Sequence, residues 1–407
     1  MSNDAQPEIR FPGFTDDWEQ RKLGEVADII GGGTPNTNNP EYWNGDIDWY
    51  APAEIGKQIY VKNSQKKISQ LGLQKSSAKI LPIGTVLFTS RAGIGNTAIL
   101  AKEGTTNQGF QSIVPHENKL DSYFIFSRTH ELKRYGEVTG AGSTFAEVSG
   151  KQMAKMPILI PYIDEQQKIG IFFKKLDDTI TLHQRKLDLL KETKKGFLQK
   201  MFPKNGAKVP EVRFPGFTED WEERKVFEIS KVTYGGGTPK TNTKEFWNGN
   251  IPWIQSSDLE INRLFNVSPK KKITNEAVKK SAAKIIPPNS IAIVTRVGVG
   301  KLALMPFEYA TSQDFLSLSE LQIDSYFGIF SLYSMLQKEL KNIQGTSIKG
   351  MTKSDLLEKK VTIPKKYEEQ QKIGNFFKQL DDTIALHQRK LDLLKETKKG
   401  FLQKMFV

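Results

Sequence analysis

The sequence predicts a mixed α/β protein in which one unit occurs twice. Two mixed α/β domains in a pseudo-two-fold arrangement are separated by two long helices that form an antiparallel coiled coil. Three observations predict this fold. The chain repeats itself at half its length, each repeat ends in a long segment with heptad apolar spacing, and short β-branched runs between turn residues precede that segment.

The repeat runs through the whole chain. Its anchors are Arg10–Trp18 with Arg213–Trp221, Gly31–Pro35 with Gly235–Pro239, Trp43–Gly45 with Trp247–Gly249, Lys75–Ile80 with Lys280–Ile285, and Asp121–Phe124 with Asp324–Phe327. Residues 165–202 match 369–406 at 35 of 38 positions, whereas the preceding bodies share only these scattered anchors. The predicted segments are a first body at 1–163, a first tail at 164–202, a linker at 203–212, a second body at 213–366 and a second tail at 367–407.

Each tail is predicted to be a helix, because its apolar residues recur at alternating steps of four and three. The predicted seam contains Ile169, Phe173, Leu176, Ile180, His183, Leu187, Leu190 and Phe197 in the first tail, and Ile373, Phe377, Leu380, Ile384, His387, Leu391, Leu394 and Phe401 in the second. Two separate amphipathic helices are the alternative. About five heptads exceed what one small domain covers, so we expect the tails to pair as a rod roughly 48 Å long.

The bodies are predicted to be mixed α/β. The expected elements are a turn followed by a strand in 80–90 and 285–295, closing strands at 156–160 and 360–363, and helices at 123–134 and 326–340. The two glycine-rich loops follow apparent strands, and a Trp-Asn-Gly turn is expected after each loop.

Composition narrows the class of protein. The chain has no cysteine, which excludes disulfide scaffolds, thiolate zinc sites and thiol nucleophiles. It shows no signal-peptide pattern and no apolar run of about 18 residues, so we expect a cytoplasmic protein without a membrane span. The 59 Lys+Arg against 46 Asp+Glu leave a net charge of +13, which favours a polyanionic partner such as nucleic acid.

No credible catalytic or metal-binding constellation is visible in the sequence. The four histidines form no H-x-x-x-H pair, and two of them fall on the predicted seam. The stretch Arg296–Lys301 lacks the spacing of a phosphate-binding loop. We therefore expect this chain to bind rather than to catalyse, with no metal and no cofactor of its own.

Polar and basic side chains recur at matching places in both bodies. The candidate DNA contacts are Thr34, Asn36, Asn38 and Asn39 with Thr238, Lys240, Asn242 and Lys244; Lys57, Lys62, Lys66 and Lys67 with Arg263, Lys270, Lys271 and Lys272; Arg91 and Asn96 with Arg296 and Lys301; and Ser143 and Thr144 with Thr346 and Ser347. Asparagine suits adenine, while lysine and arginine suit guanine or phosphate. Alternatives remain open. The glycine runs could form tight turns, the lysines could be solvated surface residues, and the arginines could stabilise the fold.

The arrangement resembles the specificity (S) subunits of type I restriction-modification systems. The Gly-Gly-Thr-Pro loops with Trp-Asn-Gly, and the near-duplicate Glu-Gln-Gln-Lys-Ile-Gly…Leu-Asp-Asp-Thr-Ile…His-Gln-Arg-Lys-Leu tails, carry this resemblance over the full chain. The resemblance implies two target recognition domains, each reading one half of a bipartite double-stranded DNA sequence. It also implies helices that dock two methyltransferase (M) subunits, which use S-adenosylmethionine, with restriction (R) subunits that use ATP and Mg joining the complex.

Positions that differ between the bodies are then the candidates for base readout. These are Asn36 against Lys240, Asn38 against Thr243, and Asn96 against Lys301, while the shared Arg91 and Arg296 suit phosphate or fold contacts. The rod length would set two bodies about one B-DNA turn, 34–36 Å, apart. A two-headed coiled-coil adaptor that binds proteins without reading DNA is the alternative function. An S subunit that serves modification alone is a narrower one.

Overall fold

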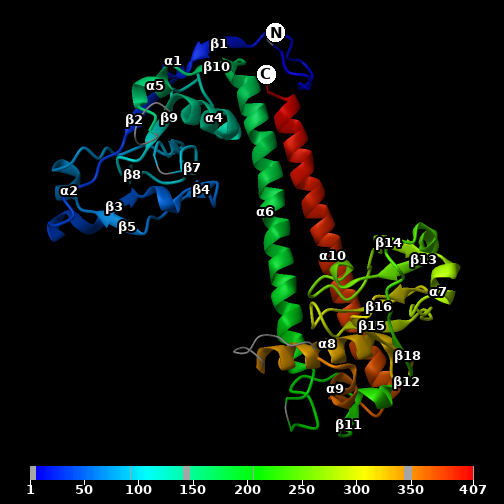
Figure 1. Ribbon diagram of the computed structural model, residues 1–407. Helices are drawn as coiled ribbons and strands as arrows, with labels where there is room; N and C mark the ends of the chain where they lie inside the picture. Colours follow the sequence, from blue (N-terminus) through cyan, green and yellow to red (C-terminus); the bar gives the residue numbers. More distant parts are fainter. Residues whose placement is uncertain (1–5, 92, 141–146, 205, 343–350, 407) are drawn as a thin grey trace. The chain divides into compact units, whose positions relative to one another are not determined.

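The fold comprises two compact units of similar construction. The computed structural model describes residues 6–91, 93–140, 147–204, 206–342 and 351–406. Unit 1 consists of Met1–Gln184 with Lys390–Val407, and unit 2 of Arg185–Arg389. Each unit therefore holds one α/β body together with parts of both long helices, which are labelled α6 and α10 (Figure 1).

The body of unit 1 is built on short strands. They are β1 Glu19–Lys22, β2 Ala27–Gly31, β3 Trp43–Tyr50, β4 Tyr60–Val61, β5 Lys66–Ile68, β6 Val86–Phe88, β7 Thr97–Leu100, β8 Thr105–Thr106, β9 Gln111–Pro115 and β10 Pro157–Ile160. They form a five-stranded sheet in the order β2-β9-β6-β7-β4, a three-stranded sheet β5-β3-β8, and the β1–β10 ladder beside the start of α6 (Figure 1).

Short helices cover this body, and one long helix follows it. They are α1 Leu23–Val26, α2 Gln70–Gln74, α3 Ser122–Ser127, α4 Thr129–Gly140, α5 Gly150–Ala154 and α6 Ile163–Lys200, with 3-10 turns at η1 Pro40–Tyr42 and η2 Pro52–Glu54. The expected single helix over 123–134 is two helices. At the junction, the Thr129 hydroxyl donates a hydrogen bond to the Phe126 carbonyl at 2.5 Å.

Unit 2 repeats the plan. Its strands are β11 Glu222–Lys225, β12 Ser230–Gly235, β13 Trp247–Ile254, β14 Lys271–Ile273, β15 Ser290–Val294, β16 Leu302–Met305, β17 Ala310–Thr311, β18 Phe315–Leu321 and β19 Lys360–Ile363. Its helices are α7 Asn275–Lys279, α8 Ser325–Asn342, α9 Lys353–Glu358 and α10 Tyr367–Lys404, with η3 Val226–Ile229, η4 Lys244–Phe246 and η5 Ser256–Asp258. The sheets are β12-β18-β15-β16, β14-β13-β17 and β11-β19.

Within each unit the two long helices run antiparallel. In unit 1, Asp177 of α6 accepts from Lys398 of α10 at 2.6 Å, and Phe173 stacks on Phe406, so rising numbers on one helix meet falling numbers on the other. In unit 2, Lys194 of α6 binds Asp381 of α10. All sixteen predicted seam residues are buried or half-buried, which accounts for the heptad spacing.

An ion pair attaches each body to its helix. Arg10 donates two hydrogen bonds to the carboxylate of Glu165, at 2.7 and 2.8 Å, and Arg213 binds Glu369 in the same bidentate way. Both carboxylates are buried, so each guanidinium satisfies a charge that is withdrawn from water. This contact explains why an arginine begins the shared motif of both repeats.

Glycine in the long helices has a packing reason. A Cβ atom on Gly170 would lie 2.5 Å from an Asp121 carboxylate oxygen, and Gly374 stands in the same relation to Asp324. Those two aspartates cap the helices that begin at Ser122 and Ser325 by accepting backbone N–H groups. The helix therefore passes close to a capped helix end, where only glycine fits.

Candidate nucleic-acid interface

Two tryptophans hold the glycine-rich loop of unit 1. Trp49 donates its indole N–H to the Gly33 carbonyl at 2.8 Å, and Trp43 donates to the Asn36 carbonyl at 3.2 Å. The two rings meet edge to face, with centroids 5.1 Å apart. Both tryptophans lie on β3, so this strand fixes the path of the loop that follows β2.

Unit 2 has the same tryptophan clamp, by which we mean two tryptophan N–H groups that bond two carbonyls of the glycine-rich loop. Trp253 donates to the Gly237 carbonyl at 3.1 Å, and Trp247 donates to the Lys240 carbonyl at 3.2 Å. The ring centroids are 5.2 Å apart and again nearly perpendicular. The backbone of the two loops is thus held alike, while the side chain at the clamped position is asparagine in one unit and lysine in the other.

The glycine runs serve packing inside the body. A Cβ atom on Gly32 would lie 1.9 Å from the Asn107 carbonyl oxygen, and one on Gly236 would lie 1.9 Å from the Ser312 carbonyl oxygen. Each glycine loop therefore presses against the loop that follows β8 or β17. The structure favours the tight-turn alternative for these glycines over close approach of a partner.

Trp-Asn-Gly is a bulged strand start and not a separate turn. The pairing of β3 with β5 shifts register between Trp43 and Ile47, and that of β13 with β14 shifts at the matching place. Asn44 and Asn248 adopt left-handed φ angles of 59° and 60° there. Asparagine tolerates this conformation, which explains why the tripeptide appears in both repeats.

In each unit, a threonine–glutamine contact joins the glycine-rich loop to the loop that follows β8 or β17. The Thr34 hydroxyl donates to the Gln108 side-chain carbonyl in unit 1, and Thr238 donates to Gln313 in unit 2. Both glutamines are exposed. Sequence reasoning missed them, although the pairs Thr-Asn-Gln-Gly-Phe and Thr-Ser-Gln-Asp-Phe occupy matching places and were available as a signal.

A lysine completes each face. Lys66 lies 5.8 Å from the centroid of the Trp43 ring, and Lys271 lies 5.6 Å from that of Trp247. We define the loop face of unit 1 as Thr34, Asn36, Lys66 and Gln108, and the loop face of unit 2 as Thr238, Lys240, Lys271 and Gln313. The face of unit 1 combines two amide groups, which suit base edges, with one cation that suits phosphate or guanine, whereas the face of unit 2 combines one amide group with two such cations.

Most of the other candidates fall into three groups. Asn38, Asn242, Lys244, Lys57, Lys62, Lys270 and Lys272 are exposed. Asn39 is committed to capping η1, where its side chain accepts from the Glu41 backbone N–H, and Arg263 pairs with Glu260. Ser143, Thr144, Thr346 and Ser347 lie outside the described residues.

The arginines after β6 and β15 lie next to the glutamine loops. The backbone N–H of Ser90 donates to the Gly109 carbonyl, so the neighbouring residues Arg91 and Gln108 lie near each other. The backbone N–H of Thr295 donates to the Asp314 carbonyl, which places Arg296 near Gln313 in the same way. Arg91 pairs with Glu147 at 2.7 Å. Nearby, Asn96 is exposed, whereas Lys301 donates to the Ser256 carbonyl at 3.0 Å.

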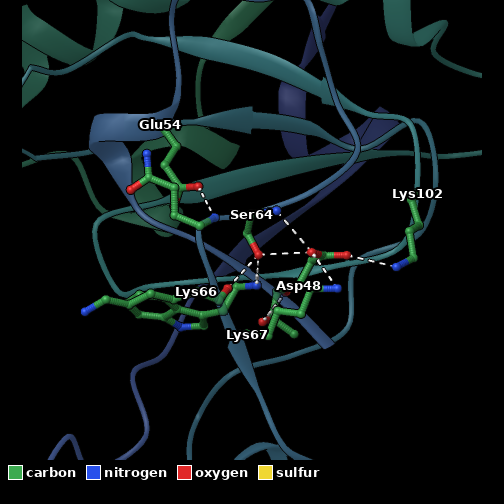
Figure 2. Close-up of polar contacts among 9 residues, drawn as sticks. Asp48, Glu54, Ser64, Lys66, Lys67 and Lys102 are labelled. Carbon is green, nitrogen blue, oxygen red and sulfur yellow. Dashed lines mark hydrogen bonds and ion pairs between the residues drawn. The ribbon is translucent and has the colours of Figure 1, made fainter. Parts of the chain in front are cut away.

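A buried carboxylate in unit 1 pairs with one of the predicted DNA-contacting lysines, Lys67 (Figure 2). Asp48, with a fully buried side chain, accepts from the Ser64 N–H and hydroxyl and from Lys102 at 3.0 Å, and Lys67 lies 3.5 Å away. Burial alone raises the pKa of Asp48, but the Ser64 backbone bond, Lys102 and the Ser64 hydroxyl together hold that pKa below its ordinary value. The predicted contact Lys67 is therefore half-buried and paired.

The described residues show neither a metal site nor a membrane-spanning helix. Among residues the structure describes, no group of three or more His, Asp or Glu side chains could hold a metal ion. In that same part of the chain, no helix is both long and apolar enough to cross a membrane.

Comparison with known proteins gives consistent matches. Residues 15–192 and 218–396 each match the type I restriction modification DNA specificity domain. The chain is similar to the type I restriction enzyme MjaIX specificity subunit of Methanocaldococcus jannaschii, with 28% identity over 420 residues that cover 96% of this chain and 92% of the relative. It is 32% identical over 167 residues to the EcoR124I/EcoR124II specificity subunit of Escherichia coli, covering 39% and 41% of the two chains.

A solved structure shows the same fold over the full length. The crystal structure of a type I restriction-modification S subunit from M. genitalium aligns with a TM-score of 0.63 and 14% identity, covering 99% of both chains.

Proposed function

The chain belongs to the family of type I restriction modification DNA specificity domains, and from that premise we propose that it is a specificity subunit whose two loop faces each read one half of a bipartite DNA target. The chain itself is non-catalytic in this proposal. Methyltransferase subunits bring S-adenosylmethionine and methylate adenine, and restriction subunits bring ATP and Mg.

One observation carries the proposal. The two loop faces share a backbone held by the same tryptophan clamp and the same threonine–glutamine contact, yet they differ at Asn36 and Lys240. A common scaffold with exchanged side chains is what two readers of different half-sites require. A two-headed protein-binding adaptor would account for the long helices equally well. It gives no reason why the two loops share their backbone contacts but differ in the side chain at the clamped position.

Exchanging the side chains at the two clamped positions, Asn36 and Lys240, tests whether these positions read bases. Asn36→Lys is expected to change base preference at one position of the half-site read by unit 1, because asparagine suits adenine and lysine suits guanine. The expected change in discrimination is about 1–3 kcal/mol at that position. Sequencing of methylated sites measures it.

The matched control is Lys240→Asn, which is expected to alter one position in the other half only. Each substitution installs a side chain that the other unit already holds at the same clamp, so both variants should fold. If neither variant changes the methylated sequence, the clamped position is not a base reader.

The helices carry a repeated apolar surface that suits docking of methyltransferase subunits. Leu182 and Leu189 on α6 are 65% and 67% exposed, and Leu386 and Leu393 on α10 are 58% and 67% exposed. Exposed leucines at heptad spacing lie on one side of a helix, away from the buried seam. Because the surrounding sequences are almost identical, the chain presents this surface twice, as two copies of one partner require.

Removing one of these surfaces should cost partner affinity. Covering a leucine side chain contributes about 1.5–3 kcal/mol, so Leu182→Gln with Leu189→Gln is expected to weaken binding of one methyltransferase subunit roughly a hundred-fold or more. Quantitative co-purification measures the ratio of the two chains.

The control replaces two exposed polar residues of the same helix, Lys186→Gln with Glu192→Gln, and is expected to retain both partner copies. Full retention of partner by the leucine variant would contradict docking at this surface.

A further inference from the structure

The two bodies differ strongly in charge. Residues 1–163 contain 17 Lys+Arg against 17 Asp+Glu, whereas residues 213–366 contain 23 against 16. More than half of the net charge of +13 therefore belongs to the second body, and none of it to the first. The difference is local as well as global, because it recurs at matching positions close to the two loop faces.

The first matched position lies on the β3–β5 and β13–β14 hairpins. Asp48 is the strand partner of Lys67 in unit 1, and Pro252 is the strand partner of Lys272 in unit 2. The buried carboxylate that engages Lys67 therefore has no counterpart beside Lys272. Lys271 and Lys272 are exposed, and neither forms an ion pair with any described residue.

The second matched position follows β6 and β15. Arg91 is paired with Glu147, which stands two residues before the helix-capping Ser149. Two residues before the equivalent cap, Thr352, the sequence has Gly350, which carries no carboxylate.

Cations gather around Arg296 instead. Lys353 is half-buried, and its pKa is lowered first by burial and then by the neighbouring Arg296, with a smaller effect of Lys284 in the same direction. Asp314 is the one carboxylate that acts against this lowering. Arg296 forms no ion pair among the residues that the structure describes, so this group of cations is set to receive an anion.

We propose that unit 2 supplies most of the phosphate contacts, and so most of the sequence-independent DNA affinity, while unit 1 contributes mainly through base contacts. The inference rests on the proposed function, and it adds a division of labour between the two recognition domains. Its physical basis is counterion release. Each phosphate neutralised by a cation contributes about 0.9 to the slope of log affinity against log salt concentration, and a cation already paired with a carboxylate contributes little.

Matched triple variants test the division. The full chain, assembled with its methyltransferase subunits, is titrated onto a fluorescent duplex of random sequence, about 30 base pairs long, at a series of salt concentrations. Lys271→Gln with Lys272→Gln and Arg296→Gln is expected to reduce the salt slope by about 2–3. Lys66→Gln with Lys67→Gln and Arg91→Gln removes equivalent residues from unit 1 and is expected to reduce it by at most about 1.

A single variant tests the same idea in the opposite direction. Glu147→Gln removes the partly exposed carboxylate that pairs with Arg91 and leaves the arginine in place. The salt slope should then become steeper by up to about 1, because a withheld cation becomes available to phosphate. An unchanged slope contradicts the claim that this ion pair withholds Arg91.

The outcomes separate this inference from the proposed function. Equal losses of slope in the two triple variants overturn the division of labour but leave two-domain DNA recognition intact. Absence of wild-type binding to the duplex even at the lowest salt concentration overturns DNA binding itself. Matching melting temperatures of the three variants and the wild type establish that slopes are compared between folded proteins.

Discussion

Exchanging residues 1–163 for the first body of another specificity subunit is expected to change one half of the methylated sequence completely and leave the other half unaltered. Each unit has its own hydrophobic core and its own loop face, so recognition by unit 2 does not draw on the exchanged residues. Sequencing of methylated adenines before and after the exchange gives the two half-sites.

The structure also specifies how the exchange must be made. The core of unit 1 includes Phe173 from α6 and Met405 from the end of α10, and Trp18 meets Phe406 edge to face at 6.2 Å. The donor body must therefore supply a tryptophan at this place and an arginine that can bind Glu165. A donor that lacks both is the matched control and should give an unstable chain. A change in both half-sites with a suitable donor contradicts the assignment of one half-site to each domain.

Deleting one heptad from both helices is expected to shorten the non-contacted spacer between the half-sites. Removal of 182–188 and 386–392 takes seven residues from each helix, which is roughly 10.5 Å of rise and about 3 base pairs of B-DNA. The contacts of Asp177 with Lys398, and of Lys194 with Asp381, lie outside both deletions and can still form.

Deleting the heptad from one helix alone is the control. The two helices then differ by two turns, so these ion pairs cannot form together, and methylation is expected to be lost. An unaltered spacer in the double deletion contradicts the idea that the helices act as a ruler.

The paired helices and the duplicated bodies are predictable from sequence because their causes are periodic. Heptad spacing marks the side of α6 and α10 that becomes buried. Lys194 and Lys398 occupy two positions of this spacing although they are polar, and each forms an ion pair with an aspartate of the opposite helix. The closing strands β10 and β19 are also found where β-branched runs predict them.

The details of the site are less predictable, since they depend on contacts between distant segments. Asp48 and Lys102 are 54 residues apart, and nothing in either neighbourhood indicates that a buried carboxylate removes Lys67 from the exposed set. Gln108 meets Thr34 across 74 residues. The candidate DNA contacts and the segment boundaries stay predictions.

Mapping N6-methyladenine across a genome that expresses this chain with its neighbouring methyltransferase subunit, against a control without this chain, decides whether the chain confers sequence specificity. For a specificity subunit we expect an asymmetric, gapped sequence with one methylated adenine in each half, present only when this chain is expressed. Absence of new methylation, with both proteins folded and associated, would contradict the specificity role and favour the protein-binding adaptor.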